Sequence, residues 1–277
     1  MNLIVPADFT AAARTAVGFA TKIAKRTGDK VILLHVYSPP VTRSNTAWPL
    51  DAETSRMISK DSDQRLGRYF GDTLNAENIH FQGKTRVGRL TDEIVIEAAE
   101  DSPSMIVMST SSNTALCALF RGSNTSGVLE STRSPVIVLP EGIQPLVPQT
   151  VTFATDCQPG DLHALEHLIS LCEKLNAEVV VLHVNTPEDG QTDHRVEKFT
   201  WRAREATGYE PISSYTVKAG DVATGLANHL ANHRSDLLVF TQRKASIWNR
   251  LFKRSLAEKI IGLVRTPILL YPSRNHP

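Results

Sequence analysis

Residues 3–8 read Leu-Ile-Val-Pro-Ala-Asp, and residues 151–156 read Val-Thr-Phe-Ala-Thr-Asp. From these two stretches the chain aligns with itself without a gap as far as Leu34-His35-Val36 beside Leu182-His183-Val184. The offset of this block is 148 residues (156 − 8). An internal repeat of this length predicts that the chain is two copies of one domain, joined head to tail.

A second block of the repeat has a different offset, 132 residues (220 − 88). It aligns Val87-Gly88 with Ala219-Gly220, Ile106-Val107-Met108 with Leu238-Val239-Phe240, and Ser134-Pro135-Val136-Ile137 with Thr266-Pro267-Ile268-Leu269. The 16 extra residues therefore fall in the first half, around Pro39 to Thr85, where Pro39-Pro40 and the polar run after it are typical of a long loop. Pro140 to Pro148 is the predicted linker, which gives domains 1–141 and 149–277.

Each half alternates short apolar runs with helical periodicity. The first-half runs predict strands at Leu3–Val5, Val31–Val36, Ile79–Val87, Met105–Met108 and Val136–Leu139. Ala16 to Ala24 and Leu165 to Leu175 have the apolar spacing of one helix face. The predicted fold class is α/β: two tandem, open, Rossmann-like parallel sheets of five strands in the order 3-2-1-4-5, with helices on both faces. The last strands, Val136–Leu139 and Ile268–Tyr271, are apolar edges, and we expect the contact between halves or between chains there.

Composition excludes several classes of protein. The formal charge of the 277 residues is +1, which gives no global basic field for nucleic acid or an anionic membrane. No stretch approaches the roughly 18 apolar residues that span a bilayer, and the amino terminus lacks the pattern of a signal peptide. The three cysteines form no Cys-x-x-Cys pair. We expect a cytoplasmic protein.

Two places in the first half are candidates for ligand binding. In an open parallel sheet, ligands bind beyond the carboxyl ends of the strands. Asp8 follows the first strand, and the segment from Ser109 to Gly122 follows the fourth strand and leads into a helix that begins near Ser123. A helix start offers free N–H groups and a positive dipole end, which favour phosphate.

The spacing of this segment resembles that of universal stress proteins of the ATP-binding type. They carry Gly, two residues, Gly, nine residues and Gly-Ser or Gly-Thr after the fourth strand, and this chain has Ser109, Ser112 and Gly122-Ser123 in that register. Val5–Phe9, Leu33–Val36, Gly88 with Asp92-Glu93-Ile94, and Ser134–Val138 are further marks of the family, in the family's order. The second half keeps the register as Thr241, Lys244 and Arg254-Ser255, with every glycine replaced.

The resemblance implies an adenine nucleotide, such as ATP, in the first half. Asp8 would hold the ribose or adenine, the backbone of Val36 would meet adenine, and Gly122-Ser123 with Asn124 would hold the phosphates. The implied site also contains Pro6, Ala7, Met108, Ser109 and Ser112. Asp8 has an alternative role as the cap of the helix that follows it. The serines cost little if their φ is negative, and strain the loop if it is positive.

We expect the second half not to bind ATP, because Lys244 and Arg254 place long side chains where phosphate would approach the backbone. Ser255 there begins a capping box. Two histidine pairs at i,i+4 spacing, His163 with His167 and His229 with His233, occupy ordinary helix positions of the repeat, so no metal site is assigned. A basic loop from Arg243 to Arg254 carries aromatic residues, whose spacing is explained by packing.

Three functions fit the sequence. The favoured one is a stress-response regulatory protein, not an enzyme, whose first half binds an adenine nucleotide and changes its affinity for an unidentified protein partner. The second is a scaffold that works without nucleotide because both sites are degenerate. The third is a slow nucleotide hydrolase, which is disfavoured because no second carboxylate, metal-ligand set or nucleophile and base pair is evident near the loops.

Overall fold

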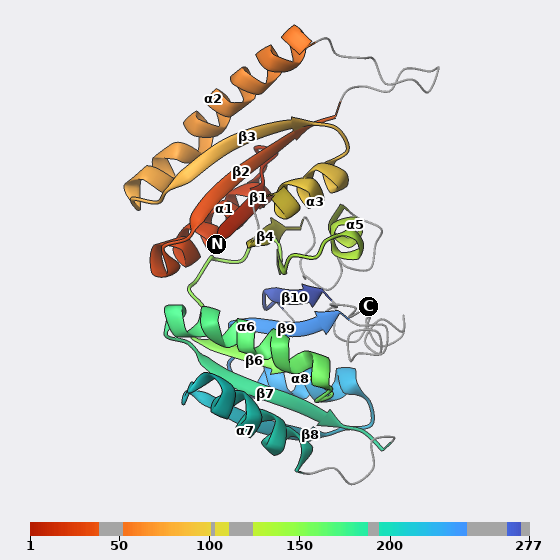
Figure 1. Cartoon of the computed structure of the whole chain (residues 1–277). Helices are drawn as coiled ribbons and strands as arrows, with labels where there is room; N and C mark the ends of the chain where they lie inside the picture. Colours follow the sequence, from red (N-terminus) through yellow and green to blue (C-terminus); the bar gives the residue numbers. More distant parts are fainter. Residues whose placement is uncertain (39–51, 101–102, 111–123, 188–193, 243–264, 273–277) are drawn as a thin grey trace, which may run out of the picture.

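The computed structural model describes residues 1–38, 52–100, 103–110, 124–187, 194–242 and 265–272 (Figure 1). The first half contains, in order, β1 (Asn2–Pro6), α1 (Ala11–Thr27), β2 (Lys30–Tyr37), α2 (Ala52–Ala76), β3 (Phe81–Val87), α3 (Leu90–Glu100), β4 (Ser104–Ser109), α5 (Asn124–Ser131) and β5 (Val136–Leu139). The second half contains β6 (Thr150–Ala154), α6 (Pro159–Leu175), β7 (Glu178–Asn185), α7 (Arg195–Thr207), β8 (Ile212–Lys218), α8 (Val222–Asn232), β9 (Leu237–Gln242) and β10 (Ile268–Pro272).

The strands of both halves form one sheet in the order β3-β2-β1-β4-β5-β10-β9-β6-β7-β8. Within each half all neighbouring strands pair in parallel. Numbered within its own half, each set of strands has the order 3-2-1-4-5. The predicted fold class is confirmed.

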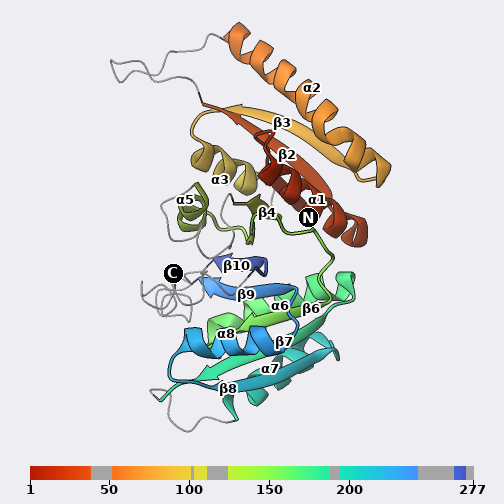
Figure 2. The ribbon, with the colours of Figure 1, turned by 180° about the vertical axis from the view of Figure 1, so that it is seen from behind.

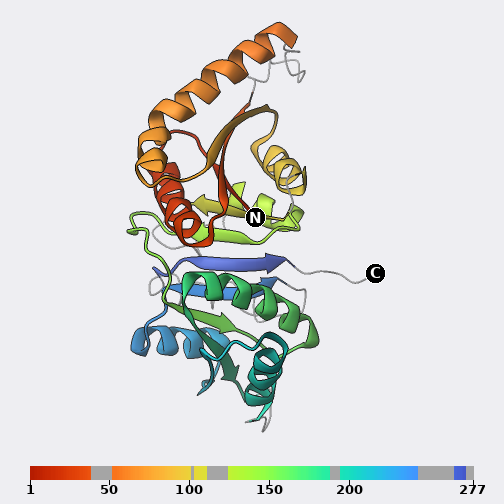
Figure 3. The same ribbon diagram turned by 60° about the vertical axis from the view of Figure 1, so that its left-hand side comes forward.

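The halves join through their last strands, which lie side by side in the middle of the sheet (Figure 3). β5 and β10 pair antiparallel, with Val138 opposite Ile268 and Val136 opposite Leu270. All four of these side chains are buried. The predicted contact between halves is confirmed, and it removes two apolar edges from water. A contact between separate chains stays a prediction.

Helices cover both faces of the sheet, as Figures 1 and 2 show from opposite sides. Because successive side chains of a strand point to opposite faces, Leu3 and Val5 belong to the apolar cluster that includes residues of α1, α2, α6 and α7, whereas Ile4 belongs to the cluster that includes residues of α3, α5 and α8. Each of the two apolar clusters runs through both halves. The sheet is therefore buried on both faces, which explains the continuous apolar runs of its central strands.

The polar run after Pro40 was predicted to be a long loop, and this prediction is wrong for residues 52–76. They form α2, a helix of 25 residues, whereas its counterpart α7 has 13 residues, so 12 of the 16 extra residues of the first half lie in a longer helix. Leu66, Phe70 and Leu74, spaced four residues apart, are its buried large apolar side chains among the described residues. This narrow stripe is enough to hold a helix whose other described positions are largely polar. Residues 39–51 lie outside the described residues.

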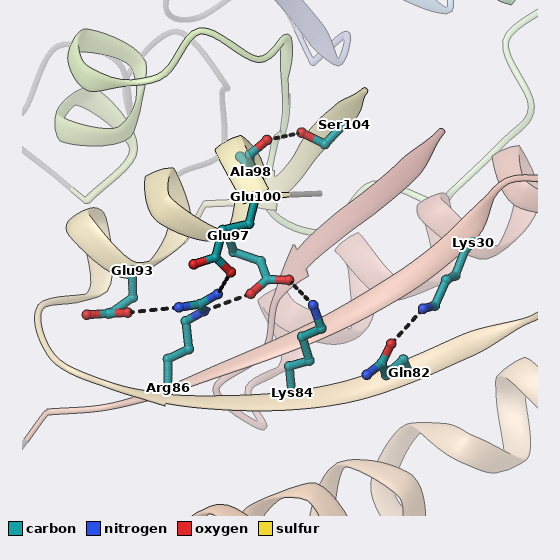
Figure 4. Close-up of polar contacts among 9 residues, drawn as sticks. All are labelled: Lys30, Gln82, Lys84, Arg86, Glu93, Glu97, Ala98, Glu100 and Ser104. Atoms are coloured by element: carbon teal, nitrogen blue, oxygen red, sulfur yellow. Dashed lines mark hydrogen bonds and ion pairs between the residues drawn. The ribbon is translucent and has the colours of Figure 1, made fainter. Parts of the chain in front are cut away.

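A buried carboxylate lies between α3 and the edge strand β3 (Figure 4). Glu97 is fully buried and accepts hydrogen bonds from Lys84 Nζ at 2.6 Å and Arg86 Nε at 2.7 Å. Arg86 also pairs with Glu100, and with Glu93 at 3.8 Å. Two cations therefore compensate the burial of one carboxylate, as a charge in a protein interior requires.

Candidate functional site

A cleft of about 1120 Å³ opens at the carboxyl ends of β1, β2 and β4. Its lining contains seven of the ten predicted site residues, namely Pro6, Ala7, Asp8, Val36, Met108, Ser109 and Asn124. Ser112, Gly122 and Ser123 lie outside the described residues. The position of the cleft follows from the topology, because β1 lies between β2 and β4, where the order of the strands reverses.

Asp8 does not cap the helix that follows it, so this alternative reading of the sequence is wrong. Thr10 is the N-cap of α1, and its hydroxyl accepts a hydrogen bond from Ala13 N at 3.2 Å. The Asp8 carboxylate accepts from Thr10 Oγ1 at 2.6 Å and from Thr10 N at 3.2 Å. Asp8 is exposed at the cleft. Its carboxylate is thus oriented by the turn and remains accessible to a ligand.

The turn that carries Asp8 is held in an unusual conformation. Phe9 has φ +63°, in the left-handed region, which is costly for a residue with a side chain. Tyr69 Oη donates to the Phe9 carbonyl at 2.9 Å, and His35 Nδ1 donates to the Ala7 carbonyl at 2.8 Å. The Phe9 ring also packs against the rings of His35 and Tyr69. Strain of this kind persists only where the surroundings fix it, and it is common at ligand sites.

Ser109 occupies the first of the three family glycine positions without strain. It is the last residue of β4, and it is not one of the described residues with a positive φ. Its hydroxyl donates to the Leu139 carbonyl at 3.4 Å. Ser109 therefore replaces the family glycine without backbone strain, because its φ is not positive. Ser112 lies outside the described residues.

The cleft also has a polar lining that the sequence reading missed. Its additional polar residues are Thr10, His35, Ser38, Arg89, Thr91, Thr110, Thr125 and Glu141. Ser38 and Thr110 each follow a strand directly, and Arg89 follows β3 by two residues. The rule that pointed to Asp8, namely that ligands bind beyond the carboxyl ends of strands, could have found these three as well.

Two helices begin at the cleft. Leu90 and Asn124, the first residues of α3 and α5, both line it. Arg89, whose side chain is 85% exposed, lies just before α3 and is 3.8 Å from Asp92. Helix starts and a guanidinium attract negative charge. The arrangement therefore suits an anion beside the exposed Asp8 carboxylate, which can accept hydrogen bonds from hydroxyl groups.

The second half repeats the backbone of this site and its Asp and His residues, but it differs in other side chains. Cys157, which follows Asp156, has φ +59°, and His183 Nδ1 donates to the Thr155 carbonyl at 2.9 Å. Asp161 stands where the first half has Ala13 (161 − 148). Its carboxylate is fully buried and accepts hydrogen bonds from Thr155 Oγ1 at 2.6 Å and from Thr241 Oγ1. Lys244, Arg254 and Ser255 lie outside the described residues.

The described thiols are poor nucleophiles. Burial is the main cause that raises the pKa of Cys157 to about 12, and burial likewise raises the pKa of Cys172 to about 12. Both thiols are therefore protonated at neutral pH. In the part of the chain that the structure describes, no three His, Cys, Asp or Glu side chains come together as a metal site. Cys117 lies outside that part.

The sequence model of the Universal stress protein family matches residues 1–140 and again residues 148–272. The chain belongs to the universal stress protein family. The predicted family and the tandem repeat are both confirmed. The two matches together span most of this universal stress protein, and each contains one of the parallel half-sheets.

Solved structures have the same fold over the whole chain. A universal stress protein from Archaeoglobus fulgidus has a TM-score of 0.71 at 17% identity, covering 99% of this chain and 97% of its own. A putative universal stress protein from Pseudomonas aeruginosa has a TM-score of 0.60 at 14% identity, covering 98% and 92%. At these identities the similarity concerns the fold alone.

None of the curated proteins compared with the chain matches it. Among the helices that the structure describes, none combines the length and the apolar character needed to cross a membrane.

Proposed function

We propose that this universal stress protein is a cytoplasmic stress-response regulator whose first half binds an adenine nucleotide, and that it is not an enzyme. The observation that carries the proposal is the cleft, because seven predicted site residues from separate parts of the first half line it together. A partner protein would respond to the occupied state. Neither nucleic acid nor a membrane is among the proposed partners.

The chemistry of the lining fits the parts of a nucleotide. The exposed carboxylate of Asp8 can accept hydrogen bonds from ribose hydroxyls. The starts of α3 and α5, together with Arg89, can neutralise phosphate. Val36 is the last residue of β2 that lines the cleft. The adenine base would meet backbone groups there. Polar groups for the sugar and phosphates therefore lie around one volume.

The proposal is tested by calorimetric titration of ATP, ADP and cyclic AMP into the untagged protein. We expect Asp8→Ala to weaken the binding of the preferred nucleotide at least tenfold, since it removes an exposed acceptor. The matched variant Asp156→Ala, at the same place in the second half, should leave the affinity unchanged. Restoring Ser112→Gly together with Ser109→Gly should tighten binding if the second serine strains the loop.

Two outcomes would favour the other functions. If neither the wild type nor the glycine-restored variant binds any of the three nucleotides, a scaffold that works without nucleotide becomes the better account. If the wild type hydrolyses ATP and Asp8→Ala abolishes turnover, the protein is an enzyme.

A further inference from the structure

The second half contains a cluster of rings that the proposed nucleotide site does not use. His229 lies on α8, and His233, four residues later, is the C-cap residue of that helix. Their ring centroids are 4.6 Å apart, with an interplanar angle of 25°. The Tyr215 ring on β8 lies 5.0 Å from the first histidine ring and 4.9 Å from the second. We call these three residues the Tyr–His cluster. It lies at the outer edge of the sheet, because β8 is the last strand.

His229 is buried without satisfying its polar atoms. His229 is 3% exposed, and neither ring nitrogen has a hydrogen-bond partner among the described residues. Buried polar groups in native proteins are nearly always paired, and an unpaired one calls for an explanation such as a bound ion or water. The two orphaned nitrogens therefore indicate a missing partner.

The first half shows how a buried polar side chain at the same helix position is paired. His229 corresponds to Glu97 (229 − 132), which receives hydrogen bonds from Lys84 and Arg86 (Figure 4). Sheet register gives the counterpart of Lys84. Phe81 pairs with Val31 and Ile212 pairs with Val179, so the strands correspond at an offset of 131 (212 − 81), and Tyr215 replaces Lys84. The second half thus has a phenol and an imidazole where the first half has an ion pair.

Histidine nitrogens are ligands for borderline divalent ions such as Zn²⁺, Ni²⁺ and Cu²⁺.

We propose that His229 and His233 bind one divalent transition-metal ion at the surface of the second half. Two histidines at i,i+4 spacing are a recurrent pair of metal ligands. The spacing here is helical as far as the cap, because the backbone N–H of His233 donates to the His229 carbonyl at 2.8 Å. His233 is exposed, so the ion can enter from solvent. The Tyr215 hydroxyl lies 3.2 Å from Nε2 of His233, as the outer partner of a metal-binding histidine does, and this leaves Nδ1 for the ion. Water would occupy the remaining coordination positions.

The other histidine pair provides a control with the same spacing. His163 Nδ1 contacts Glu166 at 3.2 Å, and His167 Nδ1 contacts the Tyr271 hydroxyl at 3.0 Å. Both rings of this pair have protein partners, whereas the two ring nitrogens of His229 have none among the described residues. Spacing alone therefore predicts two equal metal sites, whereas the contacts predict one, at the Tyr–His cluster.

Titration of NiCl₂ and ZnCl₂ into the untagged full chain, followed by calorimetry, tests the proposal. We expect one equivalent to bind, and both His229→Leu and His233→Ala to weaken binding at least tenfold. Tyr215→Phe should weaken it by a smaller factor, since it removes only the outer hydrogen bond. The double variant His163→Gln with His167→Gln should bind like the wild type.

A thermal melt separates metal binding from a structural role. His229→Leu should keep or raise the melting temperature of the metal-free protein, because it removes two buried unpaired nitrogens, and should lose the rise that metal causes in the wild type. Absence of one-equivalent binding by the wild type, unchanged binding by His233→Ala, or loss of binding in the His163 and His167 variant would overturn the proposal. His233 is exposed, so its variant keeps the test valid if His229→Leu does not fold.

Discussion

The cleft beside Asp8 and the corresponding place beside Asp156 have the same local backbone conformation but differ in the side chains around it. Both have a left-handed residue after the aspartate, and both have a histidine that donates to the last carbonyl before it. In the first half Ala13 lines an open cleft, whereas in the second half Asp161 fills the equivalent position with a buried, hydrogen-bonded carboxylate. The repeat has kept its scaffold while the chemistry of the two sites has diverged, because fold and site are separate properties.

The two places also differ in charge. Arg89 precedes α3 in the first half, but Asp221 stands at the corresponding position and caps α8, accepting a hydrogen bond from Thr224 N at 2.8 Å. Among the described residues, the second half thus has carboxylates at the two positions where the first half has Arg89 and Ala13, which disfavours phosphate. The expectation that the second half does not bind ATP rested on the replacement of every loop glycine, by Thr241, Lys244 and Arg254, so Asp161 and Asp221 provide an independent reason for it.

The largest effect that we expect is on stability. It concerns one helix position of the repeat, which is Glu97 in the first half and His229 in the second. Glu97→Ala should lower the free energy of unfolding by about 3 kcal/mol, because it removes the buried carboxylate that pairs with both Lys84 and Arg86. Urea denaturation followed by circular dichroism measures this. His229→Leu, at the matched position, should not lower the free energy of unfolding. A loss of similar size in both variants would mean that the position matters only for packing.

The next effect transfers the second half's acidic side chain to the first. Ala13→Asp should weaken adenine-nucleotide binding about 100-fold, equivalent to about 2.7 kcal/mol, by placing a carboxylate in the cleft. Calorimetry with the nucleotide preferred by the wild type measures this. The reciprocal variant Asp161→Ala should not change that affinity. Undiminished binding by Ala13→Asp would mean that the ligand lies elsewhere.

A third effect is a pH dependence of stability that comes from His229 in the second half. The pKa of His229 is about 4 in the folded chain, below its ordinary value of 6.5, so the unfolded chain binds more protons between these values. Stability should therefore fall as the pH drops through this window, by at most about 1.4 kcal/mol per pH unit from this one group. His229→Leu should flatten that part of the profile. Parallel melting profiles of the two proteins between about pH 4 and about pH 7 would contradict the assignment.

The smallest effect compares the helix caps that follow the two aspartates. Thr10→Ala should destabilise the protein by about 1 kcal/mol, because the Thr10 hydroxyl caps α1. Gln158, the N-cap of α6, makes no capping hydrogen bond with its side chain, so Gln158→Ala should have little effect. Chemical denaturation of both variants measures the difference. Equal losses would show that the Thr10 hydroxyl contributes nothing specific to helix α1.

The sequence by itself determined the repeat, the parallel order of the strands, the contact between the last strands and the place of Asp8 beyond β1. These features follow from local patterns, because buried parallel strands are continuous apolar runs and the right-handed crossover leaves few topologies. The family marks are likewise runs of neighbouring residues, so they could be read before any contact was known.

Only the tertiary structure decided the contacts between distant residues. It made a helix of the polar segment around Leu66, and it shifted β8 by one residue against the repeat, which brings Tyr215 beside His229. It also joined Asp161 to Thr241, 80 residues away, by a buried hydrogen bond. Such contacts depend on register and on the direction of each side chain, and a local sequence pattern does not contain either of them.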